Sequence, residues 1–272
     1  MAVSGGMGIC SGLDADTRKS NPYDASLVFV YDQGTTVEKG QDTPAQQAMA
    51  NAGIDFSSFS SQVEYLNVYN PGQVEGGENL NVSGLAKASG VSPDIAGLSA
   101  STDYSALSMY LMTQSDYNKL RSLNGLDPVD LGDNGYLILS SQAAFMTNFD
   151  NAVMAAGTQI SLGGRTLSPV SSTADAGPSA TPADTGSWFD VVVVPDGLVQ
   201  GAELADSIVD LNYSVDTETG DAKFLAETEK LSSATDADGQ YRFYLYGTRT
   251  GALQSSQMTS GVISYLAIYI GF

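Results

Sequence analysis

The chemistry open to this chain is limited first by the residue types it lacks. None of its 272 residues is histidine, which excludes Ser-His-Asp and Cys-His sites, histidine-bearing metal sites and the commonest general base. The G-x-S-x-G, Walker A and G-x-G-x-x-G patterns are also missing from the sequence. Pairs among its 31 acidic residues could serve glycoside hydrolysis, but such pairs are set in space, not along the chain. We therefore expect no enzyme, no catalytic residue, no metal and no cofactor, and no ligand-contacting residue can be named.

Three short patterns have a chemical and a structural interpretation. Residues 236–239 (Asp-Ala-Asp-Gly) resemble the start of a calcium loop, but the later acidic ligands and the closing Glu are missing; a plain turn is the better interpretation. Asn81 and Asn212 each begin an Asn-x-Ser glycosylation pattern, which is too common to indicate modification. Trp188 and Phe189 fit a core anchor better than a ligand platform.

The acidity of the chain restricts its partners. The formal net charge is −20, from 31 acidic and 11 basic residues. Such a surface repels nucleic acid and anionic lipid headgroups, whereas it attracts a cationic partner. The alternative is that the acidity only keeps the domain soluble. The single cysteine, Cys10, allows no internal disulfide, so packing must hold the fold together.

Both ends of the chain are apolar. Residues 261–272 carry no charge and would span roughly 18 Å as a helix, against the roughly 20 residues that a bilayer core requires. They are either a buried terminal helix or the start of a membrane span. Residues 1–13 are also uncharged and lack the basic region of a signal peptide. We interpret residues 1–13 as the end of a preceding transmembrane helix, 14–258 as an extracellular domain, and 259–272 as the start of the following transmembrane helix.

The same order of elements is expected near both ends of the polar part. Residues 25–31 and 62–69 have strand patterns, and between them Thr43-Pro44 opens a helix that ends at Gly53. This is a βαβ-like or split βαβ unit. A strand at 207–214, a helix at 222–231 and a strand at 241–246 repeat that order.

The middle of the chain is less regular. We expect weak helices at 82–88 and 93–98, a strand at 107–113, and a helix over 116–123 capped by Ser115. Further along we expect a strand at 136–139, a helix at 143–156, half a hairpin at 159–164, a linker at 171–187 and a buried strand at 188–194. The fold class is therefore α+β, with mixed sheets, βαβ-like units and terminal helices leading to the membrane. We predict two lobes, one of residues 20–70 with 186–250, and a second of residues 71–185 inserted in it.

Several segments together resemble a known family. They are residues 21–24 (Asn-Pro-Tyr-Asp), 115–125 (Ser-Asp-Tyr-Asn-Lys-Leu-Arg-Ser-Leu-Asn-Gly), 128–131, 135–138, 192–196 and 261–272. The chain resembles the large extracellular domain of an FtsX-like (MacB/BceB-type) ABC transporter permease over nearly its whole length, although each motif is short. The resemblance implies a non-enzymatic domain on the outer face of the cell membrane, anchored there in the full-length protein. A cytoplasmic ATP-binding subunit would drive it through the membrane part, and a peptide, lipid or cell-wall protein would be its outer partner.

Other functions fit the same sequence. An acidic sensor domain could capture cationic antimicrobial peptides, and an actuator could activate a cell-wall hydrolase by contact. A free secreted binding or adhesion protein would instead fold its apolar ends back onto the body. We expect no nucleic-acid partner under any of these hypotheses.

Overall fold

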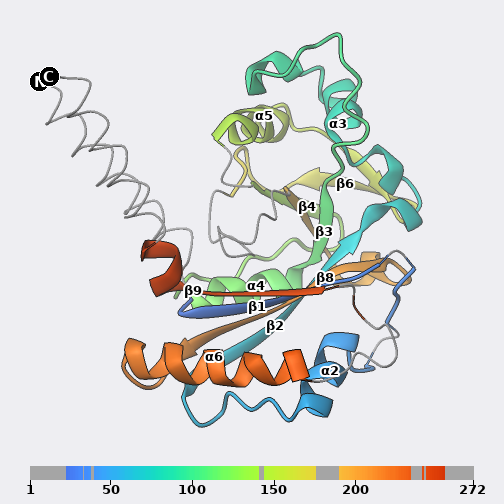
Figure 1. Ribbon diagram of the computed structural model, residues 1–272. Helices are drawn as coiled ribbons and strands as arrows, with labels where there is room; N and C mark the ends of the chain where they lie inside the picture. Colours follow the sequence, from blue (N-terminus) through green and yellow to red (C-terminus); the bar gives the residue numbers. More distant parts are fainter. Residues whose placement is uncertain are drawn as a thin grey trace, which may run out of the picture.

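One mixed sheet runs through the molecule. The computed structural model describes residues 23–32, 34–37, 40–140, 144–175, 190–233, 241 and 243–254. Within these residues, strands pair in the order β5-β6-β4-β7-β3-β2-β8-β1-β9 (Figure 1), which confirms the predicted α+β class. The apolar ends with Cys10, the residues Trp188 and Phe189, the turn at 236–239 and most of the linker lie outside the described residues.

Four strands form an antiparallel half of the sheet. β8 (Glu203–Tyr213) lies between β2 (Ser60–Asn70) and β1 (Ala25–Val30), antiparallel to both, and β1 pairs on its other side with the antiparallel β9 (Phe243–Thr248). β1 and β2 are therefore parallel, with β8 between them, and β8 and β9 are parallel, with β1 between them.

Each of these parallel pairs is connected by a helix. α2 (Pro44–Ala52) joins β1 to β2, and α6 (Thr217–Ser233) joins β8 to β9. Two interlocked split βαβ units result, which is the ferredoxin-like β-α-β-β-α-β topology. The predicted strand-helix-strand order at both ends is confirmed.

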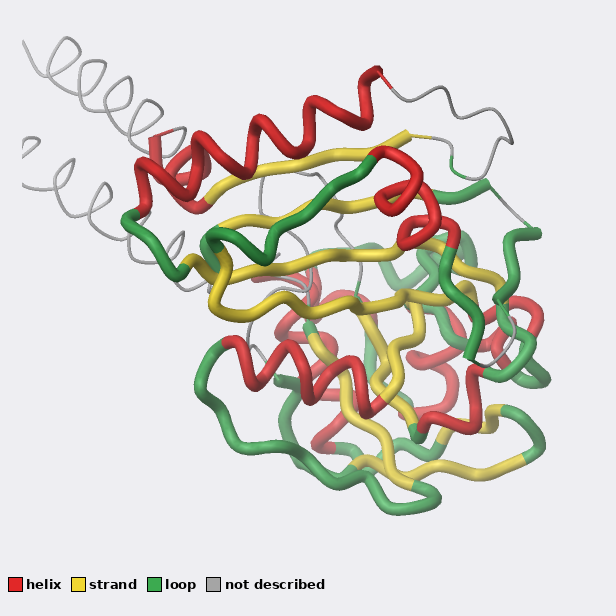
Figure 2. Tube along the Cα trace, turned by 90° about the horizontal axis from the view of Figure 1, so that it is seen from below, coloured by secondary structure: helices red, strands yellow, loops and turns green. Residues whose placement is uncertain are grey.

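The two connecting helices cover one face of the antiparallel half (Figure 2). The core beneath them includes fully buried Phe29, Phe59 and Phe224. The ends of α2 follow its sequence: Thr43 and Gln46 form a capping box, and Gly53 ends the helix in the left-handed conformation at φ 66°. Both predicted boundaries of α2 are confirmed.

The chain between β2 and β8 builds the rest of the sheet. β3 (Tyr110–Thr113) is parallel to β7 (Val191–Val194), β7 is antiparallel to β4 (Gly135–Leu139), and β4 is parallel to β6 (Arg165–Pro169). β5 (Ile160–Leu162) forms the expected hairpin with β6. β7 belongs to the predicted first lobe, yet it pairs with two strands of the predicted inserted lobe. The division into lobes stays a prediction.

Helices and short 3-10 turns complete this half. They are α3 (Val82–Ser89), α4 (Gln114–Leu123), α5 (Ala144–Ala155), η1 (Pro71–Gln73), η2 (Gly77–Asn79), η3 (Pro93–Ala96) and η4 (Asp196–Val199). The structure differs from the expected elements in several places: β8 begins at Glu203, not at residue 207, and the expected helix at 93–98 is the short 3-10 turn η3. β3 begins at Tyr110, not at residue 107, the cap of α4 is Thr113, not Ser115, and α6 begins at Thr217, not at residue 222. Among the described residues, no helix combines the length and the apolar character needed to cross a membrane.

Candidate functional site: carboxylates at the chain ends and in the core

Asp24 connects three strands at one end of the antiparallel half. Its carboxylate accepts a hydrogen bond from the Tyr213 backbone N–H at 2.7 Å and forms an ion pair with the Arg249 guanidinium. Its backbone N–H donates to the Leu211 carbonyl at 3.0 Å, and its carbonyl accepts from the Arg249 N–H at 2.8 Å. One residue thus fixes the start of β1 to the end of β8 and to the residue after β9.

These contacts bring together the described residues that lie nearest to the two apolar segments. Tyr23 is the first described residue of the chain, and the short helical stretch that begins at Arg249 contains the last ones. Because β9 is antiparallel to β1, its last residue, Thr248, lies opposite Ala25, the first residue of β1. The chain therefore enters and leaves the described body at neighbouring positions.

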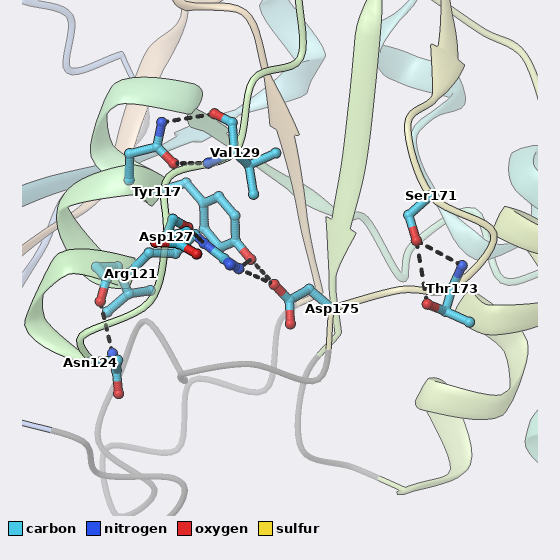
Figure 3. A network of polar contacts seen from close by, with 10 residues as sticks. Tyr117, Arg121, Asn124, Asp127, Val129, Ser171, Thr173 and Asp175 are labelled. Atoms are coloured by element: carbon cyan, nitrogen blue, oxygen red, sulfur yellow. Dashed lines mark hydrogen bonds and ion pairs between the residues drawn. The ribbon is translucent and has the colours of Figure 1, made fainter.

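A second polar network ties α4 to the mixed half of the sheet (Figure 3). The Arg121 Nη1 donates to Asp175 Oδ2 at 2.8 Å, and the Tyr117 hydroxyl donates to the same oxygen. The guanidinium of Arg121 also lies over the Tyr117 ring, 5.6 Å from its centroid. Burial, with the neighbouring Asp175 carboxylate as the next cause, raises the pKa of the Tyr117 hydroxyl, so this tyrosine is a hydrogen-bond donor at neutral pH.

The backbone of Asp175 links that network to β4. Its N–H donates to the Ile138 carbonyl at 2.8 Å, and its carbonyl accepts from the Ser140 N–H at 2.9 Å. The Asn118 side chain, next to Tyr117 on α4, exchanges two hydrogen bonds with the Val129 backbone, at 2.8 and 2.9 Å (Figure 3). Through these contacts α4 is tied to β4 and to the segment that follows the helix, which indicates a structural network.

A third cluster is a buried pair of carboxyl groups. The Ser140 hydroxyl donates to Asp150 Oδ2 at 2.6 Å, and Asp150 and Asp190 are 0% and 5% exposed. Burial raises the pKa of Asp150 to about 8, and the nearby charge of Asp190 adds to the effect. At neutral pH Asp150 is therefore mainly protonated, so the pair can share a proton as two adjacent carboxyl groups do.

Two more carboxyl groups lie in β8, the central strand of the antiparallel half. Burial raises the pKa of Asp206 to about 6 and the pKa of Asp210 well above its usual range. Asp210 is fully buried opposite Ser26 of β1, and neither of its oxygens has a hydrogen-bond partner of normal geometry within the described structure. The carboxyl of Asp210 is therefore neutral in the fold, because ionising it there would leave an unpaired buried charge.

The chemistry available to these groups is proton holding and ion pairing. Within the described part of the chain, no three residues of the His, Cys, Asp or Glu types gather as they would around a metal ion. Asp150, Asp190 and Asp210 are at most 5% exposed, so a substrate would need the core to open before reaching them. The arrangement favours structural roles for these carboxyl groups.

The glycosylation patterns prove to be structural where the structure describes them. Asn81 caps α3: it is 6% exposed, and its side-chain oxygen accepts from the Gly84 N–H at 2.8 Å. Asn212 lies in β8, where its side chain accepts from the Asp24 N–H at 3.2 Å. Both side chains are therefore engaged in the fold.

No site residue could be named from the sequence, and the buried acids were missed there. Asp150 shows a signal in retrospect, since it follows Phe149 on the face of α5 that also carries Met146 and Val153, at helical spacing. Asp210 stands inside the apolar run of β8 in the same way. Asp24, in contrast, precedes a strand as many solvated residues do, and no local signal marks it.

Neither a scan of protein-family models nor a search of curated proteins found a match to the chain.

Proposed function

We propose that this chain is the non-catalytic extracellular domain of an FtsX-like ABC transporter permease. In this role it couples ATP-driven motion of the membrane part to transport, sensing or partner activation outside the cell. The observation that supports this best is the Asp24–Arg249 contact, which places the entry and exit of the described body side by side. A domain inserted between two consecutive membrane helices needs this geometry, because both helices begin at one membrane surface.

The same contact suggests how motion would enter the domain. β1 and β9 are hydrogen-bonded neighbours over their whole length, and Asp24 adds β8 through the Tyr213 N–H. A displacement of the two membrane helices would reach three paired strands together. The ATP chemistry would take place on a separate cytoplasmic subunit, and the outer partner would be a peptide, a lipid or a cell-wall protein.

The first test is the location of the domain. In the full-length protein with Cys10→Ser and every further native cysteine replaced, a Ser101→Cys change places a thiol on an exposed loop. A membrane-impermeant maleimide should label it in intact cells, whereas a thiol on the ATP-binding subunit should react only after permeabilisation. Labelling of the introduced loop thiol only after permeabilisation would overturn the proposal.

The second test is coupling. In the permease assembled with its ATP-binding subunit, trapping with ATP and vanadate should change the maleimide labelling rate of the domain. Arg249→Ala should reduce that change while ATP hydrolysis continues. Arg165→Ala serves as the matched control, since Arg165 is exposed in the β5–β6 hairpin far along the sheet. An unchanged labelling rate on trapping would count against coupling. Equal effects of the two variants would show that the Asp24–Arg249 contact does not transmit the motion.

A further inference from the structure

β9 forms one edge of the sheet. It is the last strand in the order of pairing, and its inner edge pairs with β1 from Phe243 to Thr248. Within the described part of the chain, no strand pairs with its outer edge and no helix lies along that edge. β2 differs in this respect, because α4 lies along its outer edge and bonds to Asn67 and Tyr65. An uncovered edge presents backbone donors and acceptors that a further strand can use.

The pairing with β1 shows which backbone groups of β9 face outward. The Arg249 N–H donates to the Asp24 carbonyl at 2.8 Å, so Arg249 presents its N–H to the inner edge. Alternate residues of an antiparallel strand bond to the same neighbour. Leu245 therefore also faces inward with its backbone groups, whereas those of Tyr244 and Tyr246 face outward. No hydrogen bond from another described residue occupies the N–H or carbonyl of these two tyrosines.

Both faces of this edge carry apolar side chains. Tyr244 and Tyr246 lie on the face that α6 covers, with their rings stacked 6.4 Å apart at 23°. The Tyr246 ring also meets the ring of Phe224 on α6, 6.4 Å away, and stays 45% exposed. On the opposite face, Leu245 packs against the larger core cluster and is only partly buried. A strand added to β9 would cover this surface from the side.

The charge of the edge restricts what can bind there. The chain has 31 acidic residues, yet none lies in residues 240–272, which include β9. A basic partner would find no carboxylate on this strand, and an acidic partner would be repelled by the net charge of −20. The matching occupant is an uncharged apolar strand, and β9 of a second copy is such a strand.

We propose that β9 pairs antiparallel with β9 of a second copy of this chain, about a twofold axis at Leu245. In this register Tyr244 of each copy lies opposite Tyr246 of the other, so the outward N–H and carbonyl groups of both tyrosines are all used. The contact is self-complementary, as a twofold interface requires. It also adds aromatic cross-strand pairs to the tyrosine stack of each copy.

The geometry of this pair agrees with the way the chain leaves the described body. A twofold axis between antiparallel edge strands is perpendicular to the sheet, so both copies turn the same face to the same side. The short helical stretch that begins at Arg249 lies on the face opposite α6 (Figure 1). Thr248 follows Leu245 by three residues, which places the two exits about 20 Å apart on one side of the pair. Two permease copies in one membrane require exits on one side; this point rests on the proposed function, whereas the pairing itself does not.

The first test is cross-linking of the 272-residue chain with Cys10→Ser, in a mild detergent that keeps its uncharged ends from associating. Leu245→Cys should give a disulfide-linked dimer on gentle oxidation. The opposed Cα atoms of a non-hydrogen-bonded pair lie about 4.5 Å apart, which is within the range that a disulfide spans. Ile95→Cys is the control, because Ile95 is 48% exposed but lies in η3, beside α5. Random collision would link this more exposed thiol at least as fast.

The second test measures the dissociation constant of the dimer by sedimentation velocity. At about 1 M salt the Debye length is about 3 Å, so repulsion between the acidic chains is screened. Tyr246→Pro removes one outward N–H from each copy, and proline is tolerated on an open strand edge. Tyr246→Ala is the matched control, because it loses the same ring and keeps the N–H. The proline variant should pair about tenfold or more weakly than the alanine variant, since two hydrogen bonds are lost in each dimer.

Three results would overturn the inference. They are a wild-type chain that stays monomeric at every concentration, equal cross-linking through Leu245→Cys and Ile95→Cys, and equal dissociation constants of the two Tyr246 variants. Circular dichroism establishes whether both variants are folded. If the proline variant does not fold, hydrogen exchange decides: the Tyr244 and Tyr246 amides of the wild-type chain should exchange more slowly as its concentration rises, and unchanged exchange would contradict the pairing.

The pairing and the proposed permease function can fail separately. A dimer formed through β9, in a protein whose loop thiol is labelled only after permeabilisation, would support the pairing and overturn the permease function. A monomeric chain whose loop thiol is labelled in intact cells would do the reverse.

Discussion

Replacing Asp150 with Asn should stabilise the fold, and the gain should grow with pH. The wild-type carboxyl has its pKa raised from 3.8 to about 8, chiefly because it is buried. Between these two values the folded chain binds a proton that the unfolded chain has lost. The free energy of unfolding therefore falls as pH rises through this window.

The size of the effect follows from that window. Each pH unit within the window lowers the free energy of unfolding by about 1.4 kcal/mol. Ionisation of this carboxyl in the unfolded chain therefore removes on the order of 5 kcal/mol of stability by pH 8. The amide side chain of the Asp150→Asn variant would be neutral at every pH. Its oxygen can accept from the Ser140 hydroxyl as Asp150 Oδ2 does, and its NH₂ group can donate on the side of Oδ1, which has no hydrogen-bond partner of normal geometry in the described structure.

The assay is urea unfolding at several pH values from about 4.5 to 8 at constant ionic strength, followed by far-UV circular dichroism. The two proteins should differ least at the acid end, and the advantage of Asp150→Asn should widen toward the alkaline end. Asp216→Asn is a control of opposite sign. Asp216 is exposed and accepts from the Thr219 N–H at 3.0 Å, and hydrogen bonds from Thr219 lower its pKa. Its charged form therefore stabilises the fold above the usual pKa range for Asp, and any loss in the Asn variant should stay constant over this pH range, because it fades only as pH falls below that usual range.

A stability difference that stays constant over this pH range would refute the reasoning. A stability difference that shrinks as pH rises would also refute it, because the pKa of the Asp150 carboxyl would then be lower in the folded chain than in the unfolded chain. A slope of about half the full value would still support it, since water reaching the site and structural relaxation reduce the cost of burying a charge.

Two further predictions concern packing in the antiparallel half. Phe224→Ala removes a fully buried ring and should cost about 3–5 kcal/mol in urea unfolding, whereas Leu225→Ala, at a side chain that is 41% exposed, should cost under about 1 kcal/mol; equal losses would contradict the assigned core face. Gly220→Ala would place a Cβ 2.2 Å from the Tyr213 ring and should cost about 1–3 kcal/mol, while Gly197→Ala, which meets no atom within 4 Å, should change the melting temperature little. A Gly220→Ala protein with unaltered stability would show that the Tyr213 ring can move aside.

Local signals predicted those elements whose ends are capped by recognisable residues. Thr43 and Gly53 set the bounds of α2, and both could be identified from sequence. α6 was placed too late because Gly220 in its first turn reads as a helix breaker. In the structure Asp216 precedes that helix and caps it, accepting from the Thr219 N–H, and a Cβ in place of the glycine would meet the ring of Tyr213.

Sheet order and the buried acids depend on contacts that are distant in sequence. β7 continues an apolar run that marks it as buried, but nothing in that run indicates that it lies between β3 and β4. Asp150 could be recognised as an acid on an apolar helix face, whereas its neighbour Asp190 comes 40 residues later along the chain. The pair exists only because α5 packs beside the sheet, so no local pattern could have predicted it.

The join between the two halves of the sheet bears on how the domain could move. The backbone connection is narrow, because β2 and β3 share one residue pair, Tyr69 and Leu111. The packing connection is broad: one core cluster includes Leu66 of β2, Leu111 of β3 and Val193 of β7, all of them fully buried. Rotating one half against the other would expose this apolar surface, at about 25 cal/mol for each Å².

Side chains of α4 reinforce the same join. Asp116 and Lys119 bond to the outward backbone groups of Asn67 and Tyr65 at 3.1 and 2.9 Å, while Arg121 holds the helix to Asp175 at 2.8 Å. The described body should therefore move as one rigid unit. In the proposed permease, a small rotation at the Asp24–Arg249 end would become a larger displacement at the far end of the sheet, because displacement in a rigid rotation grows with distance from the pivot.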